Sequence, residues 1–121
     1  MSSKVDAVYI STPNIFHREH TERATRAGAH VLYEKPMATT EEDCEAMIRA
    51  AEENQVKLMI ANRLHFNDAN LHAVELAQSG DLGELRYFNS LFGMQVKFGN
   101  IRVRKDLGGG TLYDIGIYHS E

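Results

Sequence analysis

A lysine at the end of a short apolar run and an aspartate–tyrosine pair near the C-terminus could together carry out acid–base chemistry. Lys35 is in "VLYEKPMATT" (residues 31–40), and Asp114 and Tyr118 are in "GGGTLYDIGIYHSE" (residues 108–121). If the second segment is helical after its glycines, Asp114 and Tyr118 lie four residues apart on one face. A carboxylate beside a phenol can transfer a proton when an ammonium group is brought in, because a nearby cation lowers the phenol pKa from about 10.

Each of these residues also has a purely structural interpretation. Lys35 can extend to solvent or pair with Glu34, and Tyr118 can be an ordinary residue of an amphipathic helix, with Asp114 as a cap or ion-pair partner. Pro36 disfavours helical conformation at Lys35, and the bond between them is a candidate for the cis form. The local sequence leaves both interpretations open.

The elements that must position these residues are predicted to form an α/β fold with a parallel sheet. Apolar runs at residues 5–10, 30–34 and 56–61 are typical of strands buried on both faces. Helical patterns lie between them, at residues 17–28 and 39–54. Gly28 is in the position of a helix-ending glycine, and Thr39 precedes Glu42 by three residues, as in a capping box. Strands alternating with helices of about 10 to 15 residues indicate consecutive βαβ units.

The sequence pattern changes near residues 63–67, where we place a domain boundary. A helix is expected at residues 67–79, with Leu71 and Val74 on one side and Gly80 as its end. Residues 83–98 have the pattern of a half-exposed strand in an antiparallel sheet. We therefore divide the chain into residues 1–65, part of the parallel sheet, and residues 66–121, the start of an α+β domain.

Three strands and two helices bury little apolar surface by themselves. In the doubly wound strand order they would be only the C-terminal half of a sheet, and the first of them would have an unpaired edge. We therefore expect the sequence to be a fragment of a larger protein.

Composition excludes several function classes. The 121-residue chain has a net charge of −4 and no run of Lys or Arg, which argues against a nucleic-acid partner. No segment reaches the roughly 20 apolar residues of a membrane span. A single cysteine, Cys44, and the lack of a leader-like N-terminus predict a cytoplasmic protein. His17 and His20 have a spacing compatible with metal binding, but a zinc site needs three or four ligands, so we predict no metal. Cys44 lies on the apolar face of a predicted helix and is expected to be a core residue.

Four blocks, "STPNIFH", "AGAHVLYEKPMA", "NRLHF" and "GGGTLYDIGIY", occur in this order. Together they resemble the glucose–fructose oxidoreductase/inositol dehydrogenase (Gfo/Idh/MocA) family, from Val5 to nearly the end of the chain. The resemblance implies a Rossmann-type sheet and hydride transfer between NAD or NADP and a sugar, polyol or related carbinol or carbonyl substrate. It also implies a homo-oligomer for the full-length protein, with residues 66–121 beginning the substrate and oligomerisation domain. The alternative is a non-catalytic Rossmann-type module that binds a ligand or docks on a partner, because a fold does not prove activity.

The resemblance also assigns site residues. It implies that Lys35 lies at the junction of nicotinamide and substrate, that Tyr118 is the acid/base, and that Asp114 binds substrate and supports Tyr118. The implied cofactor-binding positions are Thr12, Pro13, Asn14, His17, Glu34, Lys35 and Arg63. The glycine-rich turn that holds the pyrophosphate in this family does not occur in the sequence. We therefore expect the 121-residue chain alone to bind nicotinamide cofactor weakly or not at all.

Overall fold

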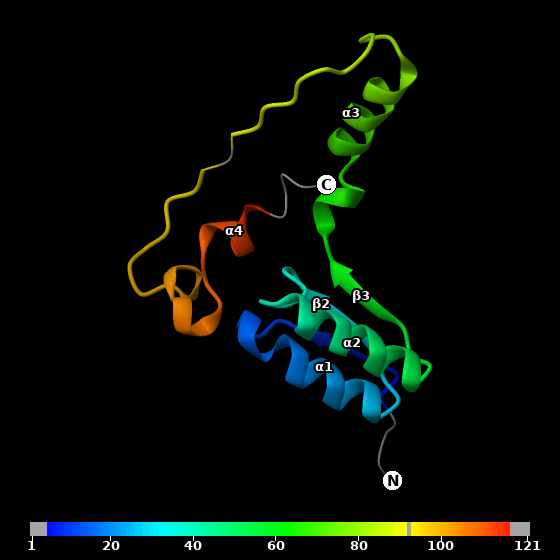
Figure 1. Cartoon of the computed structure of the whole chain (residues 1–121), viewed down its shortest axis with the longest axis vertical. Helices are drawn as coiled ribbons and strands as arrows, with labels where there is room; N and C mark the ends of the chain where they lie inside the picture. Colours follow the sequence, from blue (N-terminus) through cyan, green and yellow to red (C-terminus); the bar gives the residue numbers. More distant parts are fainter. Residues whose placement is uncertain (1–4, 92, 117–121) are drawn as a thin grey trace.

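The computed structural model describes residues 5–91 and 93–116. Its strands β1 (Ala7–Ile10), β2 (His30–Glu34) and β3 (Leu58–Ala61) form one parallel sheet in the order β1-β2-β3. Helix α1 (His17–Arg26) connects the first two strands, and α2 (Glu41–Glu53) connects the second and third (Figure 1). The predicted βαβ units and the α/β class are confirmed.

The ends of the two helices follow local sequence rules, with one correction. After α1, Gly28 has a φ of +78°, in the left-handed region that glycine adopts without strain. The N-cap of α2 is Thr40, whose hydroxyl accepts a hydrogen bond from the amide of Asp43 at 3.2 Å. The capping box predicted at Thr39 is therefore wrong by one residue, because the chain is still extended at Thr40 and turns helical only at Glu41.

The core lies between the sheet and the two helices. Side chains of alternate strand positions point toward α1 and α2, and Met47 of α2 is completely buried against them. The buried apolar residues are Ile10, Ala29, Val31, Tyr33, Ala38, Met47, Ala50 and Ala51. Burial raises the pKa of the Tyr33 phenol, since charge is disfavoured in an apolar environment.

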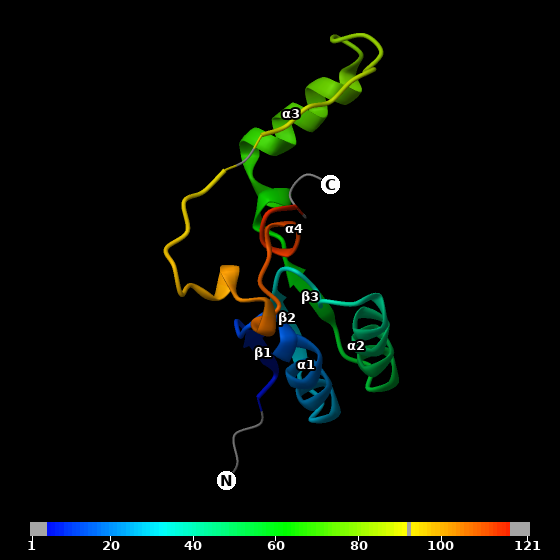
Figure 2. The same cartoon turned by 60° about the vertical axis from the view of Figure 1, so that its left-hand side comes forward.

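A second part of the chain extends away from the sheet. After the short 3-10 turn η2 (Arg63–Phe66), helix α3 (Asp68–Ser79) begins at Asn67, whose side chain accepts from the amide of Ala69, and ends at Gly80. This confirms the helix predicted at residues 67–79. The helix projects away from the sheet and has no buried residue (Figures 1 and 2).

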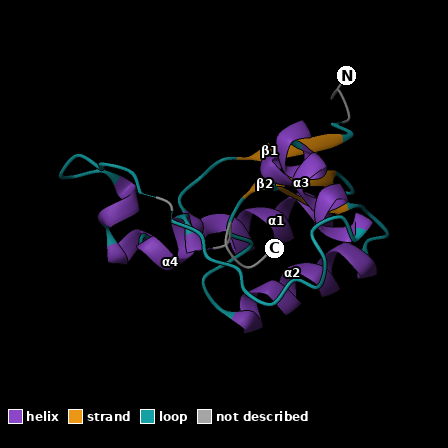
Figure 3. Ribbon diagram, turned by 90° about the horizontal axis from the view of Figure 1, so that it is seen from above, coloured by secondary structure: helices purple, strands orange, loops and turns teal. Residues whose placement is uncertain are grey.

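The opposite face of the sheet is open. Tyr9, Leu32 and Met59 point away from the helices and are 55%, 38% and 51% exposed. Figure 3 shows α1 and α2 on the same side of the strands. The prediction that the strands are buried on both faces is therefore wrong for the part of the chain described, because both crossover helices cover one face.

The strand predicted at residues 83–98 is wrong for the described residues, which contain no strand there. A strand requires a partner for its main-chain groups, and the described residues of this segment form an extended connection without one (Figure 1). Residues 83–98 are followed by two 3-10 turns, η3 (Ile101–Val103) and η4 (Lys105–Leu107), and by the short helix α4 (Thr111–Asp114). These turns and α4 lie near the carboxyl ends of β1 and β2 (Figure 1). Within the described ranges, no helix is long and apolar enough to cross a membrane.

An ion network joins the outer surfaces of α1 and α2. Arg18 contacts Asp43 of α2 at 2.7 Å and Glu22 of its own helix at 2.9 Å, and Arg26 contacts Glu22 at 2.6 Å. The hydrogen bonds from Arg18 hold the pKa values of Asp43 and Glu22 below their ordinary range. The network therefore favours the packed helix pair only while these carboxylates are ionised.

Replacing the buried side chain of α2 tests the position of the core. We expect Met47→Ala to lower the free energy of unfolding by about 2 to 5 kcal/mol, because it removes packed atoms and leaves a cavity. The neighbouring Ile48, 45% exposed, is a matched control, and Ile48→Ala should cost about 1 kcal/mol or less. Urea unfolding followed by circular dichroism measures both. Equal losses would contradict this assignment of the buried face.

Acidification tests the ion network. Because the folded-state pKa values of Asp43 and Glu22 are lowered, their contribution is complete above the ordinary carboxyl values of 3.8 and 4.5 and is lost as the pH falls below them. We expect the melting temperature to fall between about pH 5 and pH 3, and the fall to be smaller in Asp43→Asn. The control is Asp81→Asn, at an exposed position after α3, which should retain the wild-type pH dependence. An unchanged profile in Asp43→Asn would show that the network contributes nothing.

Candidate active site

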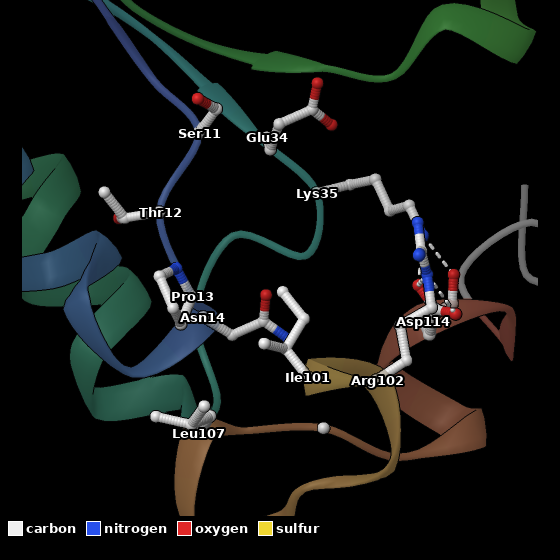
Figure 4. Close-up of a pocket in the computed structure, with 11 residues that line it drawn as sticks. Ser11, Thr12, Pro13, Asn14, Glu34, Lys35, Ile101, Arg102, Leu107 and Asp114 are labelled. Atoms are coloured by element: carbon white, nitrogen blue, oxygen red, sulfur yellow. Dashed lines mark hydrogen bonds and ion pairs between the residues drawn. The ribbon is translucent and has the colours of Figure 1, made fainter. Parts of the chain in front are cut away.

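A cavity of about 310 Å³ lies at the carboxyl ends of β1 and β2 (Figure 4). Ligands of open α/β sheets bind at this end of the strands. Its walls come from three parts of the chain: residues 11–14 after β1, Glu34 and Lys35 at the end of β2, and Ile101, Arg102, Leu107, Gly109 and Asp114 of the C-terminal segment. The cavity therefore depends on contact between segments far apart in the sequence.

Lys35 and Asp114 meet at this cavity. The Lys35 ammonium lies 3.2 Å from Oδ1 of Asp114 and also donates to the main-chain oxygen of Asp114. The two side chains are only 12% and 17% exposed. The two residues are 79 positions apart in the sequence. The Lys35–Pro36 peptide bond is cis. The structure thus brings together two of the three residues predicted for proton transfer, and the third, Tyr118, lies outside the described residues.

Arg102 is the other cation at Asp114, and sequence reasoning missed it. Its Nε lies 3.0 Å from Oδ2 and 3.2 Å from Oδ1 of Asp114, so the carboxylate is held between Arg102 and Lys35. Figure 4 shows both cationic side chains reaching Asp114, with their contacts drawn as dashed lines. No periodic pattern marks Arg102, because its position depends on the irregular turns η3 and η4; its place just before the glycine run was the only available signal.

Glu34 is held by a hydrogen bond from the open face of the sheet. The hydroxyl of Tyr9 donates to Oε1 of Glu34. This bond raises the pKa of the Tyr9 phenol, because loss of its proton would place two negative charges side by side. The Glu34 carboxylate, which lines the cavity, is therefore oriented by Tyr9, which does not line the cavity.

His17, predicted as a cofactor contact, is completely buried behind the cavity wall. Its Nδ1 lies 2.9 Å from the main-chain oxygen of Pro36, and its Nε2 lies 3.0 Å from that of Thr12. The imidazole therefore connects the two turns that carry Thr12 and Lys35. Arg63, also predicted to lie near the cofactor, begins η2 on the protein surface and is not among the residues lining the cavity.

The glycine run allows the C-terminal segment to pack closely on the first half. The side-chain amide of Asn14 donates to the main-chain oxygen of Gly108 at 2.8 Å, and the Tyr113 hydroxyl donates to that of Thr39 at 3.1 Å. A Cβ on Gly108, whose φ is +75°, would lie 2.8 Å from Thr39 and 2.9 Å from Asn14. A Cβ on Gly109 would lie 2.4 Å from the oxygen of Ile101. These glycines therefore serve close packing of the main chain.

His20 and Cys44 belong to the two alternatives that the sequence offers, a metal site and a reactive cysteine. Within residues 5–91 and 93–116, no three His, Cys, Asp and Glu side chains come together where a metal ion could be held. His20 contacts the hydroxyl of Thr12 at 3.1 Å. Cys44 is half-buried, and burial raises the pKa of its thiol, which is opposite to the change that activates a nucleophile.

Comparison with known proteins gives two family matches. Residues 1–62 match an oxidoreductase family with an NAD-binding Rossmann fold, and residues 70–120 match a GFO/IDH/MocA C-terminal domain. Among curated proteins, the chain is 38% identical to a dTDP-3,4-didehydro-2,6-dideoxy-alpha-D-glucose 3-reductase of Actinomadura kijaniata, over 94% of this chain and 35% of that protein.

Solved structures resemble the whole fold. An aldose-aldose oxidoreductase from Caulobacter crescentus complexed with glycerol is 44% identical, with a TM-score of 0.82 over 97% of this chain and 36% of that one. A 3-ketoreductase from Actinomadura kijaniata in complex with NADP and TDP-benzene is 38% identical, with a TM-score of 0.87 over 94% of this chain and 35% of that one. The chain thus spans about a third of the length of these relatives.

Adding a methyl group at Gly108 tests how the cavity is assembled. We expect Gly108→Ala to displace the C-terminal segment, because the new Cβ would collide with Asn14 and Thr39. Amide NMR signals of Asn14, Thr39 and Asp114 should shift together, and the free energy of unfolding should fall by more than the roughly 1 to 2 kcal/mol of left-handed strain alone.

Gly99→Ala is the matched control for this substitution. Gly99 has a φ of +86° but open space around its Cα, so its replacement should incur the strain without moving the cavity. If the two variants changed the signals of Asn14 and Thr39 equally, close packing at Gly108 would not be what holds the segment in place.

Proposed function

The chain belongs to the Gfo/Idh/MocA family of oxidoreductases, and we propose that it forms the nicotinamide- and substrate-facing wall of an NAD(P)-dependent active site. The substrate class is a sugar, polyol or related carbonyl compound. The observation that carries this proposal is the meeting of the Lys35 ammonium and the Asp114 carboxylate, 3.2 Å apart, over a cavity at the carboxyl ends of the strands.

The residues lining the cavity fit the nicotinamide end of the cofactor. Thr12, Pro13 and Asn14 form the wall after β1, and Glu34 and Lys35 form the wall after β2. Hydroxyl, amide and carboxylate groups are suitable partners for a ribose, and cofactors of Rossmann-type sheets bind across this edge. His17 acts in this proposal through the turns it connects, and the contact proposed for Arg63 remains a prediction.

The chain's own residues would bind and protonate the substrate. Lys35 donates a hydrogen bond to the reacting oxygen of the substrate, and Asp114 fixes the direction of Lys35. The phenol of Tyr118 gives a proton to that oxygen during reduction and takes it back during oxidation. The nicotinamide ring, when bound, supplies or accepts the hydride.

The relatives support the substrate class and the division of the chain. They include reductases of a dTDP-linked deoxy sugar and of 1,5-anhydro-D-fructose, and a D-xylose 1-dehydrogenase, all longer than this chain. In this proposal residues 1–65 are part of the nucleotide-binding domain, and residues 66–121 begin the substrate domain.

A chimera tests the function. In this chimera, residues 5–121 of this chain replace the matching segment of the Actinomadura kijaniata 3-ketoreductase, whose structure is similar over 94% of this chain. We expect the chimera to oxidise NADPH with a keto-sugar substrate, and Lys35→Met and Tyr118→Phe each to lower kcat by about 100-fold or more, as expected on losing proton transfer. NADPH absorbance gives the rate.

Lys57→Met is the control for charge, because Lys57 lies just before β3, at the end of the sheet away from the cavity. It should retain the full rate. If both Lys35→Met and Tyr118→Phe kept the full rate, the assignment of these residues to proton transfer would be overturned. A chimera that binds NADPH without oxidising it would favour a non-catalytic binding role.

A further inference from the structure

Asp114 is the last residue of a short helix that does little to fix its carboxylate. Helix α4 has four residues, and it follows a glycine, Gly110, which has no side chain to cap it. The Lys35 ammonium contacts Oδ1 of Asp114 at 3.2 Å. A lysine side chain has many rotamers and a compact charge, so this contact alone does not give the carboxylate a single direction.

Arg102 makes a contact of a different kind with Asp114. Its Nε lies 3.0 Å from Oδ2 and 3.2 Å from Oδ1, so one donor holds both oxygens of the carboxylate. The guanidinium group is planar, and its donors have fixed directions. Because the Asp114 side chain is only 17% exposed, water screens this contact less than it screens an ion pair on the surface.

The main chain from which Arg102 extends is itself held in place. The Arg102 amide donates to the side chain of Asn100 at 3.0 Å. The amide of Gly109 donates to the main-chain oxygen of Arg104 at 2.9 Å. A Cβ on Gly109 would lie 2.8 Å from the main-chain carbon and oxygen of Arg102, so the two segments are in close contact. Arg102 therefore reaches Asp114 from a fixed point.

The charges of the cavity are balanced. Among the described residues, the charged side chains lining it are two cations, Lys35 and Arg102, and two carboxylates, Glu34 and Asp114. Arg102 is therefore part of a group without net charge, and its Nε contact directs its own charge at Asp114.

We propose that Arg102 is a positioning residue of the active site. By holding both oxygens of Asp114 it fixes that carboxylate, and through the carboxylate it fixes the direction in which Lys35 presents its ammonium group to the reacting oxygen of the substrate. Arg102 does not itself contact the reactant. The effect on turnover rests on the proposed function, whereas the hold of Arg102 on Asp114 does not.

Scalar couplings measure this hold in the 121-residue chain. The three-bond couplings between Hα and Hβ of Asp114, assigned with the help of Asp114→Asn, report its χ1 rotamer. We expect the wild-type values to be those of one staggered rotamer, and the values in Arg102→Gln to be averaged over several. Arg104→Gln is the matched control, two residues along and paired locally with Asp106, and should retain the wild-type couplings.

Two results would contradict the hold. One is a single Asp114 rotamer that persists in Arg102→Gln. The other is a joint shift of the Asn14 and Thr39 amide signals in that variant, because Arg102 would then hold the whole C-terminal segment in place and not the carboxylate.

Kinetics of the chimera connect the hold to turnover. We expect Arg102→Gln to lower kcat with the keto-sugar by about 10- to 100-fold, as expected when a reacting group is misplaced. The KM for the sugar should stay nearly unchanged, because Arg102 does not contact it. In Asp114→Asn the same substitution should have no further effect, since Arg102 acts through Asp114. Arg104→Gln should keep the full kcat.

A raised KM with an unchanged kcat would show that Arg102 binds the reactant directly. Additive losses in the double variant would show that it acts independently of Asp114. Either result would exclude the positioning role. A chimera without reductase activity would instead overturn the proposed function and leave the coupling measurement unaffected.

Discussion

The ion pair between Lys35 and Asp114 joins two parts of the chain that are 79 positions apart in the sequence. The strands and helices of the first half follow from short-range patterns, and α4 belongs to a segment that returns after a long connection whose described residues contain no strand. Only where the two segments meet does the cavity have a complete wall. Because both side chains are largely shielded from water, their ion pair offsets part of the cost of burying the two charges.

Main-chain contacts make this meeting possible. Gly108 and Gly109 lie so close to Thr39, Asn14 and the η3 turn that a side chain on either would collide. On the other side of the wall, His17 contacts main-chain oxygens of both turns that face the segment. The main chain that bounds the cavity is thus packed against His17 on one side and against the glycines of the C-terminal segment on the other. The few polar side chains of the cavity therefore have defined positions.

Much of this arrangement could be predicted from the sequence, because it depends on local rules. The βαβ order, the left-handed glycines after α1 and α3, and the placement of Lys35 at a strand end all follow from patterns within a few residues. Arg102 and the buried role of His17 could not be predicted, since each depends on contacts between distant turns. The strand expected at residues 83–98 failed because alternation describes a side-chain pattern and does not supply a hydrogen-bonding partner.

Tyr9 links the open face of the sheet to the cavity. Its ring stands among the exposed apolar side chains, whereas its hydroxyl holds Glu34 at the cavity wall. Water competes for that hydroxyl as long as the face is wet. Anything that dehydrated the face would lower the local dielectric constant and strengthen the bond to Glu34. The back of the sheet can therefore affect how firmly a cavity carboxylate is held, through a single phenol and without any movement of the strands.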